Sequence, residues 1–116
     1  MIIEQMFGMV FTEVYNEQDE ILVFRNDNFT FKFLHYQDCC EDVHIESIVG
    51  DLQDLVGSPI LLAEESSSDN DVDSCEEWTF YKFATRNGYV DVRWIGSSNG
   101  YYSTSVSLNV TNHSVN

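Results

Sequence analysis

The residues in this sequence with the clearest potential for chemistry are two histidines that flank a pair of adjacent cysteines. His35, Cys39, Cys40 and His44 form a His-x3-Cys-Cys-x3-His pattern. Zinc prefers these ligand types, but the cysteines of a zinc site are normally separated by at least two residues. In a strand, Cys39 and Cys40 would point to opposite faces. The spacing favours small, partly buried residues beside a bend, and we expect no metal and no cofactor.

A cysteine close to a histidine also raises the question of nucleophilic catalysis. No signature of a thiol enzyme surrounds Cys39 or Cys40, and the chain has no phosphate-binding glycine loop, no Gly-x-Ser-x-Gly and no His-Glu-x-x-His. Pairs of carboxylates spaced like those of a glycosidase arise by chance in a chain this acidic. We therefore expect a protein that is not an enzyme and has no catalytic residue.

Carboxylates are the more informative candidates, because 20 Asp and Glu face only 5 Lys and Arg, for a net charge of -15. A rigid array of carboxylates can imitate phosphates and occupy a groove that binds nucleic acid through Lys and Arg. The alternative is that the charge serves only solubility. The residues that we predict to contact a partner are Asp38, Glu41, Asp42, Glu46, Glu64, Glu65, Asp69, Asp71 and Asp73.

The segment 66–75 is polar and acidic, with one valine, and is typical of a flexible loop. Within it, Asp69-Asn-Asp-Val-Asp73 places carboxylate and amide oxygens at alternate positions, which suits calcium. The segment lacks the glycine and the closing glutamate of an EF-hand loop. A solvated acidic loop is therefore the preferred interpretation.

The charge also limits the partners of the protein. Binding to nucleic acid or to anionic lipid needs Lys and Arg, so we expect neither direct nucleic-acid binding nor membrane binding. No apolar run approaches the roughly 20 residues that span a bilayer, and the first ten residues lack the basic charge of a signal peptide. Three cysteines, two of them adjacent, form no disulfide framework, which favours a reducing compartment. A basic protein surface is the natural complement.

Alternation of apolar and polar residues predicts the elements that hold these carboxylates. We expect about eight short strands, bounded by turn residues: 9–15, 20–25, 29–36, 42–48, 59–64, 77–85, 89–95 and 101–110. Asn87-Gly88 is the strongest hairpin signal. The pattern predicts a mainly β fold, built as an antiparallel sheet, a sandwich or a partly open barrel.

One segment departs from this alternation. Leu52, Leu55 and Val56 fall on one helical face, so we expect a short helix near 51–56, ending before Pro59. A length of 116 residues predicts a single domain over 1–116, with a disordered tail at 111–116. Trp94 and Phe80 are expected in the core, whereas Tyr101 and Tyr102 are left open between core and interface.

Five stretches of the sequence are distinctive: Tyr36-Gln-Asp-Cys-Cys-Glu-Asp-Val-His-Ile-Glu46, Ile48-Val-Gly-Asp-Leu-Gln-Asp-Leu-Val-Gly-Ser-Pro-Ile60, Ala63-Glu-Glu65, Glu77-Trp-Thr-Phe-Tyr-Lys82 and Trp94-Ile-Gly-Ser-Ser-Asn-Gly-Tyr-Tyr-Ser103. In these stretches the chain resembles a group of small bacteriophage proteins of unknown function. The resemblance covers roughly Phe29 to Leu108. It implies a phage origin and a location in the host cell cytoplasm, and it brings no catalytic residues.

Small acidic phage proteins often inhibit host machinery, as anti-CRISPR proteins and restriction inhibitors do. The expected function is therefore inhibition of a Cas effector or another DNA- or RNA-binding defence protein, through protein–protein binding by an acidic, nucleic-acid-mimicking surface. The alternative is a phage accessory or virion-associated structural protein that works as an oligomer through exposed edge strands. A small enzyme or a ligand binder, with its site in the mouth of a β-barrel, is a third class.

Overall fold

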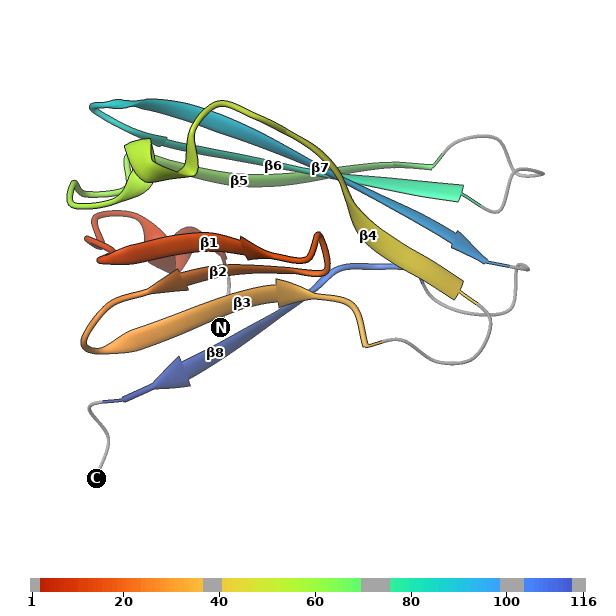
Figure 1. The fold of residues 1–116 in the computed structure, drawn as a ribbon, viewed down its shortest axis with the longest axis horizontal. Coiled ribbons are helices and arrows are strands. Elements are labelled where there is room, and N and C mark those ends of the chain that lie inside the picture. Colours follow the sequence, from red (N-terminus) through yellow and green to blue (C-terminus); the bar gives the residue numbers. More distant parts are fainter. Residues whose placement is uncertain (1–2, 37–40, 70–75, 99–103, 114–116) are drawn as a thin grey trace.

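Two antiparallel four-stranded sheets face each other in the computed structural model, which describes residues 3–36, 41–69, 76–98 and 104–113 (Figure 1). The first sheet has the order β1 (Glu13–Glu17), β2 (Ile21–Arg25), β3 (Phe29–Leu34) and β8 (Ser107–Asn112). The second has the order β4 (Glu41–Val49), β7 (Gly88–Ser98), β6 (Glu76–Thr85) and β5 (Leu62–Asp69). The prediction of a mainly β, antiparallel fold is confirmed, and of the three architectures considered the sandwich is the one observed.

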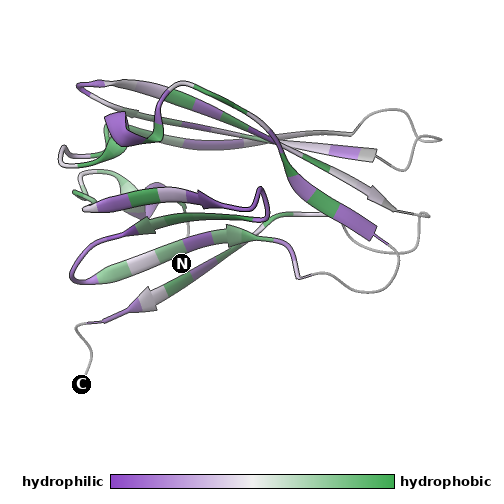
Figure 2. Ribbon diagram, in the orientation of Figure 1, coloured by the Kyte–Doolittle hydropathy of each residue, from purple (hydrophilic) through white to green (hydrophobic). Residues whose placement is uncertain are grey.

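The core lies between the sheets and is rich in aromatic rings. Phe24 of β2 lies 4.7 Å from Phe83 of β6, and Phe33 of β3 lies 4.8 Å from Tyr81 of β6, measured between ring centroids. Burying each such side chain contributes roughly 1.5 to 3 kcal/mol. Apolar and polar residues alternate along β3 and β4 as the sequence predicted (Figure 2).

Trp94 is fully buried, as expected, but the expectation for Phe80 was wrong. Side chains alternate across a strand, so residues of opposite parity face opposite sides of the sheet. Tyr81 and Phe83 of β6 face the core, which places Phe80 outside, where it is 36% exposed. When aromatic residues occupy both even and odd positions of a strand, the sequence alone does not show which side of the strand faces the core.

Two predicted boundaries are also corrected. β5 continues through Ser66–Asp69, paired with β6 from Phe80 to Glu77, so the first four residues of the predicted flexible loop belong to a strand, and the rest of that prediction, 70–75, lies outside the described residues. Thr111 and Asn112 belong to β8, so the predicted disordered tail does not begin at 111. Main-chain pairing with a neighbouring strand outweighs the weak strand propensity of Ser, Asp and Asn.

The predicted helix near 51–56 is a short 3-10 turn, η2 (Leu52–Leu55). The Asp51 carboxylate accepts a hydrogen bond from the Gln53 N–H at 2.9 Å, which caps the turn. A second 3-10 turn, η1 (Ile3–Met6), was not predicted. Its buried residues Ile3 and Met6 belong to the core cluster, so η1 closes one margin of the sandwich.

Candidate protein-binding surface

The turn between β1 and β2 reaches across from the first sheet to β4, an edge strand of the second (Figure 1). The backbone carbonyl of Asp19 accepts a hydrogen bond of 2.7 Å from the Ile45 N–H, next to an irregularity in the pairing of β4 with β7. Gln18 and Asp19 both have positive φ, as in the tight turns that join twisted hairpins. The Asn16 and Asp19 side chains share a 2.8 Å hydrogen bond that holds the turn in shape.

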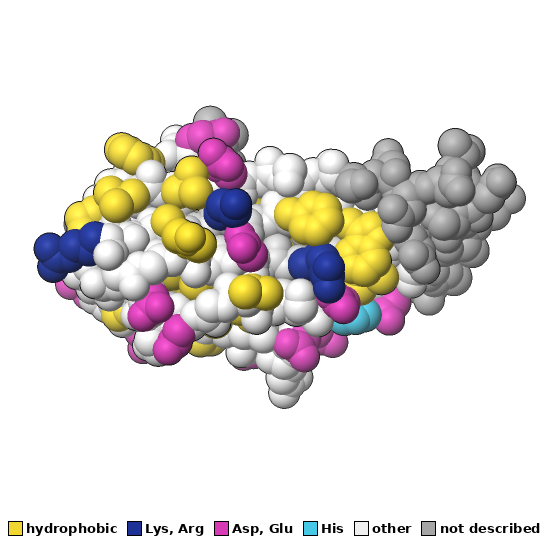
Figure 3. All heavy atoms as spheres, turned by 90° about the horizontal axis from the view of Figure 1, so that it is seen from above, with side chains coloured by type: hydrophobic (Ala, Val, Ile, Leu, Met, Phe, Trp, Pro, Cys, Tyr) yellow, Lys and Arg dark blue, Asp and Glu magenta, His cyan; other side chains and the backbone are white. Residues whose placement is uncertain are grey.

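This contact brings together carboxylates from both sheets. We name them the acidic edge and define it by Glu17 at the end of β1, by Asp19 and Glu20 in the turn that follows, and by Asp42 and Glu46 of β4. All five residues are exposed. The space-filling view shows part of this arrangement, with acidic side chains on both sides of the one histidine visible (Figure 3). A border of this kind attracts a cationic surface.

Two members of the acidic edge lie beside an arginine or a histidine of the same chain. The Arg93 guanidinium bonds the Glu46 carboxylate at 2.6 Å and lies 5.2 Å from the centre of the Trp78 ring. The Asp42 carboxylate lies 3.2 Å from Nδ1 of His44. Within the described part of the chain, Glu17, Asp19 and Glu20 make no ion pair within 4 Å. Among the five members of the acidic edge, the negative charges of these three are therefore the least neutralised by neighbouring side chains.

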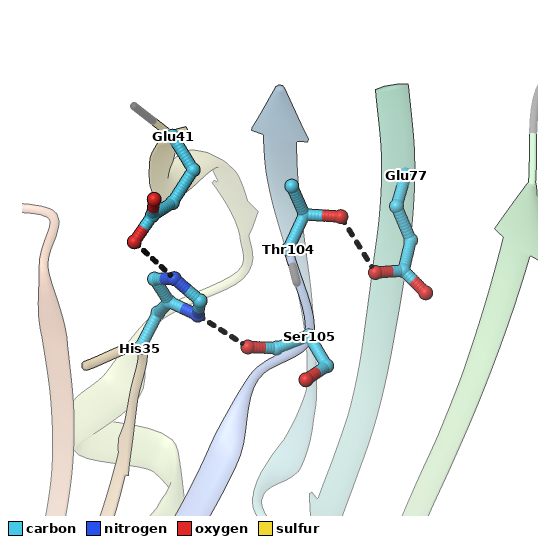
Figure 4. Close-up of polar contacts among 5 residues, drawn as sticks. All are labelled: His35, Glu41, Glu77, Thr104 and Ser105. Carbon is cyan, nitrogen blue, oxygen red and sulfur yellow. Dashed lines mark hydrogen bonds and ion pairs between the residues drawn. The ribbon is translucent and has the colours of Figure 1, made fainter. Parts of the chain in front are cut away.

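Glu41, a predicted contact residue, lies in the interior (Figure 4). Its carboxylate is 3.2 Å from Nε2 of His35, and both side chains are buried, with 1% of the Glu41 side chain exposed. Nδ1 of His35 lies 2.7 Å from the backbone carbonyl of Ser105. Because a carbonyl only accepts, Nδ1 donates to it, and a hydrogen bond between Nε2 and the Glu41 carboxyl group then requires a further proton on one of these two partners. This carboxylate joins the end of β3 to the start of β4.

A second polar contact lies beside this pair. The Thr104 hydroxyl donates a 2.9 Å hydrogen bond to the Glu77 carboxylate of β6 (Figure 4). A Cβ added to Gly96 of β7 would lie 2.6 Å from the Thr104 Cβ. The chain before β8 therefore crosses directly over β7, and only glycine leaves it room. Together with His35, this contact ties the two sheets at one end of the sandwich.

Glu64 and Glu65 lie on β5, at the opposite edge of the second sheet from β4. The two intervening strands separate these edges by about 14 Å. Glu64 pairs with Lys82 and Glu65 with Tyr81 in the register of β5 and β6. Burial, and then the neighbouring Glu65, raise the pKa of the Tyr81 hydroxyl far above its usual range.

The remaining predicted contact residues cannot be placed in the same way. Asp38, Asp71 and Asp73 lie outside the described residues, and so does the side chain of Asp69 at the end of β5. The predicted set therefore divides: Asp42 and Glu46 join the acidic edge, Glu64 and Glu65 lie across the sheet, and Glu41 is buried.

Comparison with known proteins assigns the chain to a family. Residues 4–108 match the family described as "Domain of unknown function (DUF7448)". The chain belongs to the DUF7448 family. The match runs from η1 into β8 and so includes both sheets. Searches of curated proteins and of solved structures found no match. The function of this DUF7448 domain must therefore be argued from its own surface.

Sequence reasoning missed three members of the acidic edge in this DUF7448 domain. Glu17 and Asp19 were predicted to lie in the polar turn between the strands 9–15 and 20–25, and Glu20 at the start of the second of these strands, without a role in binding. Their position depends on the hydrogen bond from Ile45, which is 26 positions along the chain from Asp19. No local pattern carries that information. The only available signal was the acidic composition of the turn, Asn16-Glu-Gln-Asp-Glu20.

The described part of the DUF7448 domain contains no group of three or more His, Cys, Asp or Glu residues that could hold a metal ion. The pattern of two histidines and two cysteines cannot be judged as a whole, because Cys39, Cys40 and Cys75 lie outside the described residues. Of its histidines, His35 is buried against Glu41 and His44 lies on β4 beside Asp42. Among the described helical segments, none is long and apolar enough to cross a bilayer.

Proposed function

We propose that this domain acts by binding, without catalysis, to a Lys- and Arg-rich surface of a host nucleic-acid-binding defence complex, in place of the nucleic acid. The observation that carries the proposal is the acidic edge, where the Asp19–Ile45 hydrogen bond joins carboxylates of two sheets along one border. A groove that binds phosphates offers several cationic side chains in a row. A row of carboxylates is the complement of such a groove.

Rigidity supports this proposal as much as charge does. The turn that carries Glu17, Asp19 and Glu20 is held by its own hydrogen bond, from the Glu20 N–H to the Glu17 carbonyl at 3.0 Å, and by the bond to β4. The backbone of this turn is therefore already fixed before binding, and association with a target restricts it little further. An array that is already in place loses less entropy on association than a mobile acidic loop would.

The choice of target follows from the resemblance of the sequence to small phage proteins. A phage protein meets host complexes that recognise DNA or RNA, and Cas effectors and restriction enzymes are the main examples. The net charge of -15 favours rapid encounter with such basic surfaces. It also predicts that encounter slows as salt screens the charges, over a Debye length of about 8 Å at physiological ionic strength.

The test is a binding measurement with a purified guide-loaded Cas effector or a restriction complex. The edge variant carries Glu17→Lys, Glu20→Lys and Asp42→Lys. The matched control carries Glu4→Lys, Glu13→Lys and Asp27→Lys, which are exposed positions away from β4 and change the net charge equally. We expect the edge variant to lose at least about tenfold in affinity, equivalent to about 1.4 kcal/mol. The control should stay within about threefold of the wild type.

Equal losses in both variants would mean that net charge alone governs binding, and the acidic edge would then have no special role. The alternative function, an oligomer built by pairing of edge strands, has less support. The free edge of β4 is contacted by the β1–β2 turn at Ile45. The other edge strand of the second sheet, β5, carries Glu64, Glu65 and a run of serines, a composition that discourages pairing between chains.

A further inference from the structure

The face of the second sheet that points away from the first sheet differs from the rest of this acidic molecule. We name it the outer face and define it by the outward residues of its four strands, which include Val49, Trp78, Phe80, Lys82, Tyr89, Asp91, Arg93 and Glu64. Tyr89 is 70% exposed and Val49 is 65% exposed. Figure 3 shows apolar side chains spread over this face with basic groups between them.

Charges of both signs alternate across the strands of the outer face. The register places Lys82 of β6 between Asp91 of β7 and Glu64 of β5. Within the described part of the chain, none of these three makes an ion pair within 4 Å, so each is available to a partner. Arg93 lies two residues after Asp91 on β7, and its guanidinium already forms an ion pair with Glu46. Lys82 and Arg93 balance Glu64 and Asp91 on this face. Asp42 and Glu46 of β4 point the same way, so these six described residues sum to -2 in a chain of net charge -15.

We infer that the outer face binds a second copy of this chain. A face with exposed apolar groups and free charges of both signs is complementary to itself. In a two-fold arrangement, Lys82 of each copy faces the Glu64 or Asp91 carboxylate of the other, because an isologous interface makes every contact twice. A purely basic partner would instead be repelled by Lys82 and Arg93, and a purely acidic one by Glu64 and Asp91.

The extent of the outer face fits a weak dimer. Four strands about 4.8 Å apart and about ten residues long cover roughly 600 Å². A standard interface buries about 800 Å² on each partner. A depression of about 510 Å³, bordered by Val49, Phe80, Lys82 and Arg93, offers a place for a side chain of the other copy. We therefore expect dissociation in the micromolar range rather than an obligate dimer.

Salt dependence separates this inference from the proposed function. Two copies of net charge -15 repel each other, so salt strengthens their association through a face that carries charges of both signs. Salt weakens binding of the acidic edge to a basic target. Sedimentation velocity from about 1 to 200 µM, at about 0.05 and 0.5 M NaCl, should show a dimer that increases with both protein and salt. A monomer under every condition would overturn the inference and leave the proposed function untouched.

Substitutions locate the interface. Phe80→Asp on the outer face should abolish the dimer, whereas Tyr15→Asp, at a similarly exposed aromatic of β1 in the first sheet, should leave it unchanged. Thermal unfolding of both variants checks that they remain folded. A dimer that survives Phe80→Asp would contradict this interface.

Charge exchange provides a second test, independent of the Phe80 variant. One variant carries Lys82→Glu, and the other carries Glu64→Lys with Asp91→Lys. Each alone places like charges across the two-fold axis, and each should be monomeric. A mixture restores opposite charges at both contacts and should form a one-to-one heterodimer. A mixture that stays monomeric while the wild type dimerises would show that these charges do not face each other.

Discussion

Two glutamates of β4 show how burial changes the role of a carboxylate. Glu41 pairs with His35 in the interior, with 1% of its side chain exposed, whereas Glu46 pairs with Arg93 at the surface. Removing one partner of a buried pair leaves the other polar group without compensation, and this costs several kcal/mol. Exposed pairs contribute less than about 1 kcal/mol, because water replaces the lost partner.

We therefore predict that Glu41→Ala lowers the free energy of unfolding by about 3 kcal/mol, as measured by urea denaturation. Glu46→Ala is the matched control, since it also removes a carboxylate of β4 that has a basic partner, and its effect should stay below about 1 kcal/mol. Equal effects of the two substitutions would contradict the assignment of Glu41 as an internal tie between the sheets.

Tyr81 supplies a prediction for the dependence of stability on pH. Its hydroxyl is buried without a hydrogen-bond partner among the described residues, and burial, followed by the nearby Glu65, raises its pKa far above the ordinary value near 10. In the unfolded chain this tyrosine releases its proton above about pH 10, but in the folded protein it keeps it. The contribution of Tyr81 to stability is therefore complete below pH 10 and is lost progressively as the pH rises further.

Tyr81→Phe should flatten this alkaline loss of stability, which urea denaturation at pH 7 and at pH 10.5 would measure. At pH 7 the variant should be as stable as the wild type or more stable by up to about 1 kcal/mol, because it removes an unpaired buried hydroxyl. Tyr89→Phe, at an exposed position, is the control and should leave the alkaline limb unchanged. Identical alkaline profiles for wild type and Tyr81→Phe would contradict this account.

At the scale of elements, alternation was sufficient to predict most strands but not their inner faces. Val90, Val92 and Trp94 share one parity in β7 and face the core, as the pattern indicates. In β6, Phe80 and Tyr81 offer aromatic rings on both sides, and only the packing against the first sheet selects Tyr81. Phe80 on the outer face was therefore not recognised as a surface residue.

The candidate site was less predictable than the fold, for a related reason. Asp42 and Glu46 were predicted from their position in a strand, but the turn residues Glu17, Asp19 and Glu20 join them only through a contact between sheets. Glu41 differs from its neighbour Asp42 only because His35 and Ser105 surround it. Such contacts depend on how the two sheets pack, and a local pattern of residues does not encode them.

For the whole molecule, the distribution of charge distinguishes two surfaces, for which we propose different partners. The acidic edge is rich in uncompensated carboxylates, whereas the outer face beside it carries free charges of both signs among apolar groups. A dimer formed through the outer face would place two acidic edges at its rim. Each copy would then present its edge to a basic partner, so the two proposals are compatible within one assembly.

The central claim is that the acidic edge takes the place of nucleic acid on its target, and a competition measurement tests it most directly. Labelled target DNA is bound to a guide-loaded Cas effector or a restriction complex, and this protein is added in increasing amounts. The account predicts that bound DNA is released as this protein binds, and that the Glu17, Glu20 and Asp42 variant releases little. A stable ternary complex, with DNA and this protein bound together, would contradict it.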